Sequence, residues 1–243
     1  MKPAHDWLAC LPRDRLMAEY SLWSADLIRL GDDMARVETF VDIWHIDVAD
    51  GQFSPALLFF PDLVAACRKL SAKPFHVHLM VADAVLLDQI RQFAEAGADL
   101  ISIHAENANA DAGLALIAEL GLASGIVLQL DTPVAQAKPW LNRIAMLTFL
   151  GTRIGVKGQG LDPTACPRLA QAKAMIAASG RRIVLAADGG IRENTVPGLR
   201  RAGAETIVMG SLAFNAPNLA ARMAWVHAQP KDAQPKDAKP KDE

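Results

Sequence analysis

The chain has 243 residues, of which 51% are hydrophobic, 21% charged and 6% aromatic, and this length is close to that of one eight-stranded α/β barrel. Its 25 basic and 27 acidic residues give a formal net charge of −2, so the charge balance favours neither nucleic acid nor a membrane surface as a partner. The apolar runs are far shorter than the ~20 residues of a spanning helix, and three widely spaced cysteines exclude a disulfide framework or a cysteine zinc cluster.

Apolar, β-branched segments alternate with segments of helical period from residue 19 to residue 227. Helices are expected after Ser24 as N-cap, over residues 61–70 and 84–96, and from Asp162-Pro163 to Gly180. The alternation favours parallel strands joined by right-handed crossovers, and hence a single closed (β/α)8 TIM barrel rather than an open doubly wound sheet. The eight predicted strands cover residues 20–23, 43–48, 75–81, 100–104, 125–130, 145–150, 182–187 and 206–210.

Both ends of the chain lie outside this alternation. Residues 1–18 are expected to form an N-terminal extension with a short helix that caps the bottom of the barrel, which itself spans residues 19–228. The tail over residues 229–243 repeats Gln-Pro-Lys-Asp-Ala and has no apolar residue larger than alanine or proline, so we expect it to be disordered. The N-terminus lacks the basic and apolar regions of a secretory signal, and we expect a cytoplasmic protein.

Four polar side chains interrupt the ends of apolar strands, where barrel enzymes place their chemistry. His45 and Asp47 are two residues apart on one strand, so they share a face, and this face is the lumen if Ile46 packs outward. His78 lies near the end of the third strand, and Asp188 follows the seventh. Each residue alone has a structural explanation, but together the two imidazoles and two carboxylates predict a site for a divalent cation.

Three further polar residues near these strands have plainer explanations. His76 shares the parity of His78 but lies deeper, which indicates a structural role. Asp50 is expected to fix the backbone of the loop after the second strand. His104 lies beside Glu106 at the end of the fourth strand, and the sequence leaves its role open: it is either structural or in contact with the substrate.

Glycine-rich turns follow three neighbouring strands. They cover residues 187–191 after the seventh strand, 209–211 after the eighth, and 155–159 after the sixth, where Lys157 adds a positive charge. Backbone amides freed by glycine at these strand ends form the phosphate site that is common in such barrels. The three turns together indicate a phosphorylated substrate.

These residues resemble the ribulose-phosphate 3-epimerase family over residues 19–215. Residues 45–55 resemble the family's most specific motif, His-x-Asp-x-x-Asp-Gly-x-Phe-x-Pro, and residues 21–26 resemble its opening strand. The other family motifs follow in the same order, at residues 78–80, 104–106, 188–191 and 210–211.

The resemblance implies a metal ion, usually zinc, iron, manganese or cobalt, held by His45, Asp47, His78 and Asp188. It implies that Asp47 and Asp188 are the two acid/base residues, which transfer protons at C3 on opposite faces of the sugar through a metal-stabilised cis-enediolate. D-ribulose 5-phosphate and D-xylulose 5-phosphate are the default substrate and product, and the family commonly forms homodimers or hexamers. The implied substrate-binding residues are Ser21, His78, Met80, Gly155, Val156, Lys157, Gly158, Gly189, Gly190, Gly210 and Ser211.

The sequence also departs from the family pattern around the sugar and the phosphate. Lys157 replaces a glycine of the phosphate loop, Ala49 a methionine, Gln52 a histidine and Phe60 a glycine. The metal and acid/base residues are intact, so the expected reaction is retained, whereas the substrate could be another ketose phosphate such as D-allulose 6-phosphate or a tetrulose phosphate. The remaining alternatives are a barrel related to sugar-phosphate decarboxylases and a barrel that binds phosphate without catalysis.

Overall fold

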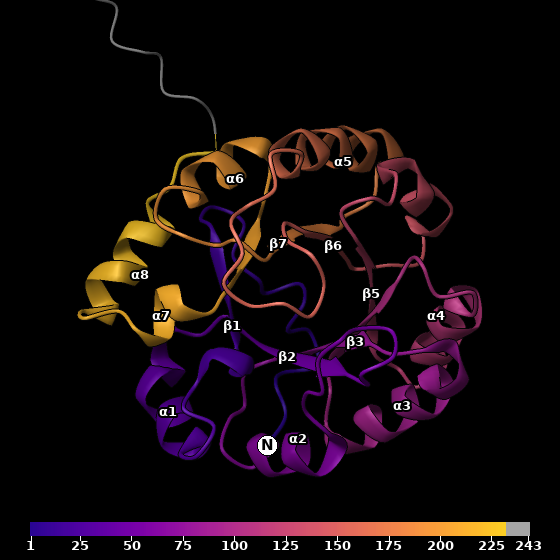
Figure 1. The fold of residues 1–243 in the computed structure, drawn as a ribbon, viewed down its shortest axis with the longest axis horizontal. Helices are drawn as coiled ribbons and strands as arrows, with labels where there is room; N and C mark the ends of the chain where they lie inside the picture. The colour runs from indigo at the N-terminus through magenta and orange to yellow at the C-terminus, as the bar shows by residue number, and fades with distance from the viewer. Residues whose placement is uncertain (232–243) are drawn as a thin grey trace, which may run out of the picture.

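The computed structural model describes residues 1–231, and these form a closed barrel in which each parallel strand pairs with the next and β8 pairs with β1. Figure 1 looks into the barrel, with the strands around the centre and the helices outside them. The predicted (β/α)8 barrel is therefore confirmed. The strands are β1 Met17–Ser21, β2 Ile43–Ala49, β3 Phe75–Met80, β4 Leu100–His104, β5 Ala123–Leu128, β6 Met146–Leu150, β7 Val184–Asp188 and β8 Thr206–Met209.

The outer ring of helices covers the apolar outward face of the strands. The helices are α1 Leu30–Val37, α2 Pro61–Arg68, α3 Asp83–Ala96, α4 Ala110–Glu119, α5 Ala165–Ser179, α6 Val196–Ala202, α7 Ser211–Phe214 and α8 Leu219–His227. The segment Val134–Trp140 between β5 and β6 is a 3-10 helix with Pro139 inside it. The helix predicted to end at Gly97 does so, because Gly97 takes the left-handed conformation, with φ of 106°, that ends a helix.

Inside the barrel, the inward side chains form layers that change from apolar to polar along the strands. The lowest layer groups Met17, Ile43, Leu100, Met146 and Val184, and Leu11 of the N-terminal segment packs against it. Two residues further along, the lumen becomes polar, because strand side chains alternate between faces with a period of two. The strand pairing places His45 beside His76 and Asp47 beside His78. Each polar side chain is thus held by a strand and not by a loop.

Four of the sequence predictions about individual elements are wrong, and the last of them concerns the N-terminal segment described below. The first strand is Met17–Ser21, so it begins inside the segment assigned to the N-terminal extension and ends before Trp23. Ser24 does not cap a helix: residues 22–24 form a 3-10 turn, and α1 begins only at Leu30. The side chain of Asp26 accepts the backbone N–H of Ile28 and so holds a turn where the helix was expected.

The third correction concerns the start of α5, which was predicted at Asp162-Pro163. Asp162 instead accepts hydrogen bonds from the backbone N–H and the hydroxyl of Thr164, and the helix begins at Ala165. Its predicted end is confirmed, because Gly180 follows the last helical residue in the left-handed conformation.

The N-terminal segment contacts both the bottom of the barrel and the last described residue of the chain. Residues 1–16 form turns in place of the predicted short helix, and Leu11 contacts the lowest layer of the lumen. The Lys231 ammonium donates to the Arg13 carbonyl at 3.2 Å, whereas residues 232–243 of the predicted tail lie outside the described residues. In the described part of the chain, the helices are too short or too polar to cross a membrane.

Candidate functional site

The four predicted metal ligands meet at the carboxyl ends of β2, β3 and β7. His45 Nε2 lies 3.3 Å from Asp47 Oδ1 and 3.8 Å from Asp188 Oδ2, and His78 Nδ1 lies 3.6 Å from each of these two oxygens. Four ligand atoms about 2.1 Å from a central cation would be about 3.4 Å apart in a tetrahedral arrangement. The observed spacing of the donor atoms therefore fits a divalent cation.

The hydrogen bonds of the two imidazoles support the same fit. His45 Nδ1 lies 2.9 Å from Glu19 Oε2, and because a carboxylate only accepts, Nδ1 carries a proton and Nε2 is the ring nitrogen that faces Asp47 and Asp188. Within residues 1–231, neither His45 Nε2 nor His78 Nδ1 has a hydrogen-bond partner. Two buried ring nitrogens without a partner, aimed at two carboxylates, are the arrangement that a cation would complete.

A second set of contacts orients His78 from the other side. His104 Nδ1 donates to Glu106 Oε2 at 3.0 Å, which leaves His104 Nε2 to accept the Nε2–H of His78 at 2.9 Å. Burial lowers the pKa of His104 to about 4, so this ring is neutral at pH 7. The proton of His78 is thereby held on Nε2, and its Nδ1 faces the two carboxylates.

The two carboxylates of the site differ in their affinity for a proton. Burial raises the pKa of Asp188 to about 6, and the nearby charge of Asp47 contributes to this rise. Burial acts in the same direction on Asp47, but His45 and His78 outweigh it and hold the pKa of that carboxyl well below its usual range. Ser21 also donates its hydroxyl to Asp47 Oδ2 at 2.7 Å. One carboxylate is thus firmly ionised, whereas the other takes up a proton more readily.

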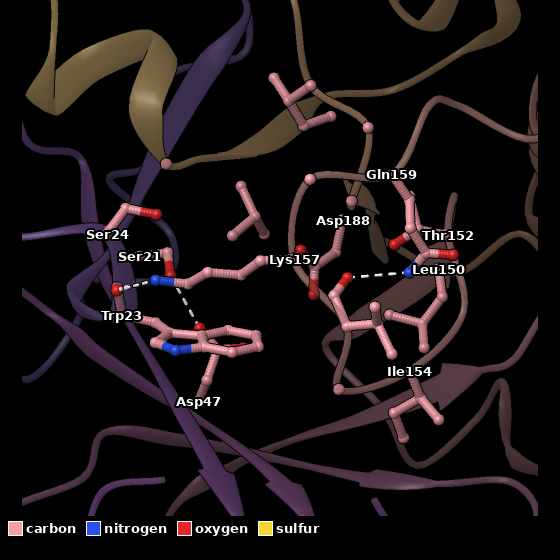
Figure 2. Close-up of a pocket in the computed structure, with 18 of the residues that line it drawn as sticks. Ser21, Trp23, Ser24, Asp47, Leu150, Thr152, Ile154, Lys157, Gln159 and Asp188 are labelled. Atoms are coloured by element: carbon pink, nitrogen blue, oxygen red, sulfur yellow. Dashed lines mark hydrogen bonds between the residues drawn. The ribbon is translucent and has the colours of Figure 1, made fainter. Parts of the chain in front are cut away.

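A cavity of about 410 Å³ opens above these groups, between the loops that follow β1, β6, β7 and β8. Figure 2 shows Asp47 and Asp188 at this cavity, with residues of the β6 loop on one side and residues that follow β1 on the other. His45 is buried beneath the lining. The other predicted site residues line the cavity: Ser21, Asp47, His78, Met80, Gly155, Val156, Lys157, Gly158, Asp188, Gly189, Gly190, Gly210 and Ser211.

Lys157 joins the two sides of the cavity mouth. Its ammonium group donates to the Trp23 carbonyl at 2.5 Å and lies 4.7 Å from the centre of the Trp23 ring (Figure 2). Burial lowers the pKa of this ammonium group, and the charge of Asp47 opposes that shift. A cation placed at the mouth of a cavity attracts an anionic substrate.

The sequence reasoning missed Glu19 and Trp23. Glu19 is a charged residue in an apolar segment and shares its parity with Ser21, which was the available signal. The role of His104 was left open between structure and substrate contact. The residue is fully buried behind His78 and does not line the cavity found in the described part of the chain. Asp50 has the predicted role, because it accepts the backbone N–H groups of Gln52, Phe53 and Ala82.

Comparison with known proteins identifies the family. The model of the ribulose-phosphate 3 epimerase family matches residues 17–214. The chain belongs to this family. It is 36% identical over 204 residues to ribulose-phosphate 3-epimerase 2 of Cupriavidus necator, covering 82% of this chain and 84% of that one. It is 36% identical over 211 residues to the ribulose-phosphate 3-epimerase of Synechocystis, covering 85% and 90% of the two chains. The prediction of an isomerase is confirmed.

Among solved structures, the epimerase fold is similar to orotidine 5'-phosphate decarboxylase from Pyrococcus horikoshii. The TM-score is 0.63 at 14% identity, and the match covers 86% of this chain and 97% of that one. At so low an identity the likeness concerns the fold alone.

The departures from the epimerase pattern are unevenly placed. Lys157 lines the cavity, whereas Gln52 and Phe60 are exposed and lie outside the lining found among residues 1–231. Ala49 is buried at the end of β2. The change that bears most directly on a bound substrate is therefore the lysine in the β6 loop.

Proposed function

We propose that this enzyme interconverts D-ribulose 5-phosphate and D-xylulose 5-phosphate by two-base proton transfer at C3, with one divalent cation at His45, Asp47, His78 and Asp188. The observation that carries the proposal is the pair of carboxylates on the cavity floor, of which Asp47 is buried and Asp188 half-buried. Asp47 comes from β2 and Asp188 from β7, and β1 and β8 lie between these strands. The two carboxylates therefore reach the cavity from different sides of the barrel, as proton transfer on two faces of one carbon requires.

The reaction removes a proton from C3, next to the C2 carbonyl, and returns a proton to the opposite face of the resulting enediolate. One of the two carboxylates, Asp47 or Asp188, would accept the proton of C3, and the other, in its protonated form, would donate a proton to the opposite face. In the reverse direction the two residues exchange these roles. A divalent cation bound by the four residues would supply a positive charge that favours negative charge on the adjacent substrate oxygens.

The remainder of the cavity would bind the other groups of the sugar phosphate. Ser21, which is hydrogen-bonded to Asp47, is placed to contact both the carboxylate and the substrate. Met80 provides an apolar wall. The loops after β6, β7 and β8 would bind the phosphate through their backbone amides, and Lys157 would add its charge.

The experiment that tests this function is proton NMR of the zinc-loaded enzyme with D-ribulose 5-phosphate in deuterated water. We expect deuterium to appear at C3 while D-xylulose 5-phosphate accumulates. Metal analysis of the same sample establishes whether one equivalent of zinc is bound. If a loaded, folded enzyme exchanged no proton of any ketose phosphate tested, the proposed reaction would be wrong.

The same measurement decides between ketose phosphates. Parallel samples contain D-allulose 6-phosphate and D-erythrulose 4-phosphate, and the kcat/KM values are compared with that for D-ribulose 5-phosphate. Because Lys157 stands at the cavity mouth, the length of sugar that fits beneath it would set the preference. A higher kcat/KM for another substrate would retain the chemistry and reassign the physiological reaction.

A further inference from the structure

A row of buried polar side chains lies in the lumen beneath the candidate cation site. It consists of Glu19 on β1, His45 on β2, His76 on β3 and Ser102 on β4, and none of the four has any exposed surface. Burying a carboxylate is costly unless donors surround it. Only His45 belongs to the proposed set of metal ligands, so the other three residues require an explanation.

The hydrogen bonds in this row have a definite direction. Glu19 Oε2 accepts the Nδ1–H of His45 at 2.9 Å and the Nδ1–H of His76 at 2.6 Å. Burial opposes ionisation of Glu19, but the two histidines outweigh it and hold its pKa well below the usual range. Burial lowers the pKa of His76, so its neutral ring is left to accept the Ser102 hydroxyl at 2.7 Å through Nε2.

We propose that Glu19 is a positioning residue of the cation site, which holds the Nδ1 proton of His45 so that Nε2 is presented to the cation between Asp47 and Asp188. The inference rests on the proposed function, because it assumes that a cation binds there. A carboxylate behind a ligating imidazole fixes the ring orientation and makes the ring a stronger donor. Glu19 thereby influences the cation without being one of its ligands.

The rest of the row holds Glu19 in place. The second hydrogen bond, from His76, keeps the carboxylate beneath His45 and away from the cation itself. Ser102 in turn fixes His76, and the neighbouring residue on β5 is Gly125. A Cβ at Gly125 would collide with the Ser102 hydroxyl, so the glycine leaves the space that this hydroxyl occupies.

Glu19, His45 and His76 could alternatively form a second cation site, since their donor atoms also lie close together. The geometry favours positioning, because Glu19 Oε2 accepts the Nδ1–H groups of both histidines at hydrogen-bond distance, so that both Nδ1 atoms already have a partner. Glu19 Oε1 has no partner among the described residues. The two interpretations differ in stoichiometry. Positioning predicts one bound zinc ion per chain, and a second site predicts two.

The test compares zinc affinity in the wild type, Glu19→Gln and Glu205→Gln by competition with a chromophoric chelator. Glu205→Gln is a matched control, because it also removes a carboxylate that has a partner, in this case Arg182. Glu205 precedes β8 and therefore lies at the opposite end of the barrel from the cation site. We expect Glu19→Gln to bind zinc about 10- to 100-fold more weakly and Glu205→Gln to bind as the wild type does. Excess zinc should restore kcat in Glu19→Gln, which a purely structural defect would not allow.

NMR of uniformly ¹⁵N-labelled, zinc-loaded wild type provides a test that needs no variant. We expect His45 to carry a slowly exchanging proton on Nδ1 and to bind zinc through Nε2. Ligation through Nδ1, or two equivalents of zinc, would overturn the inference. Wild-type zinc affinity in folded Glu19→Gln would also overturn it. The proposed function would still stand in that case if the wild type bound zinc and Asp47→Asn did not. If the wild type bound neither zinc nor iron, manganese or cobalt, the proposed function would itself fail.

Discussion

The lower layer of the lumen and the polar layer directly above it are equally buried but differ completely in chemistry. Along β1 the inward residues change from Met17 to Glu19, and along β2 from Ile43 to His45, each time over two positions. All four side chains have no exposed surface. Burial alone therefore does not distinguish the part that stabilises the barrel from the part that performs its chemistry.

The difference lies in what burial contributes in each part. In the lower layer, removing apolar surface from water stabilises the fold by about 25 cal/mol per Å². In the upper layers, burial of carboxylates and imidazoles is unfavourable and is offset only by their mutual hydrogen bonds and by any cation they bind. Substitutions in the lower layer should consequently reduce stability, and substitutions in the upper layers should reduce activity.

The largest effect is expected for the carboxylates of the upper lumen. Asp47→Asn and Asp188→Asn each remove a proton-transfer group without changing side-chain volume, so kcat should fall about 10³-fold or more while the barrel stays folded. Steady-state kinetics and circular dichroism measure the two properties separately. Activity near that of the wild type in either variant would refute the two-base mechanism.

The opposite pattern is expected in the lower layer. Met146→Ala creates a cavity among fully buried apolar side chains and should lower the free energy of unfolding by about 2–5 kcal/mol. The kcat per folded molecule should stay within a factor of about 2, because Met146 lies below the polar layers. Urea denaturation and active-site titration check this. A large fall in kcat with unchanged stability would erase the distinction between the two parts.

Acid should weaken the upper lumen more than the lower one. The folded pKa of His104 is about 4 and its ordinary value about 6.5. Between these values the unfolded chain binds a proton that the folded chain does not, so the free energy of unfolding should fall as the pH drops from 6.5 to 4, by up to about 3 kcal/mol. Denaturation of chelator-treated protein across this range, compared with His104→Gln, measures the difference. Equal slopes in the two proteins would show that His104 is not responsible.

A smaller effect is expected at the mouth of the cavity. Lys157→Met keeps the length of the side chain but removes its charge, so KM for a ketose phosphate should rise about tenfold with less change in kcat. Inhibition by inorganic phosphate should weaken in parallel. If both constants matched those of the wild type, the ammonium group would serve only its contact with Trp23.

The smallest effect is expected at the C-terminus. Removal of residues 232–243 should leave the melting temperature and kcat/KM unchanged, because this segment has no apolar side chain larger than alanine or proline with which to pack. Differential scanning calorimetry and steady-state kinetics on the shortened chain provide the check. A clear loss in either measurement would mean that the segment docks on the barrel.

Much of the fold could be predicted because the strands are rich in apolar and β-branched residues, as buried parallel strands are. The site prediction depended on parity: polar residues two apart on one strand, such as His45 and Asp47, share the lumen. Glu19 escaped this reasoning because the first strand was expected to begin at Tyr20, whereas it begins at Met17. An error of three residues at a strand end thus placed a lumen carboxylate outside the predicted first strand.

Other features depend on contacts that periodicity does not encode. The contact between Lys157 and Trp23 joins residues 134 positions apart, and each side chain alone is unremarkable in sequence. The relay from Glu106 through His104 to His78 similarly requires the register of β3 and β4. Local hydrogen bonds at Asp26 and Asp162 displaced two predicted helix starts, because short polar side chains compete with the helix for backbone N–H groups.

The placement of the candidate ligands on strands and of most of the cavity wall on loops has a consequence for protein engineering. A library confined to residues 152–159 would vary the mouth of the cavity without altering a strand. Such variants should retain the proton chemistry while they explore longer, shorter or differently charged sugars. A library that targets the charged residues and histidines of the lumen would have to change several neighbours together, since Glu19, His45 and His76 are linked by hydrogen bonds, as are His78 and His104. New specificities should consequently be accessible by single loop substitutions, and new reactions only by coordinated ones.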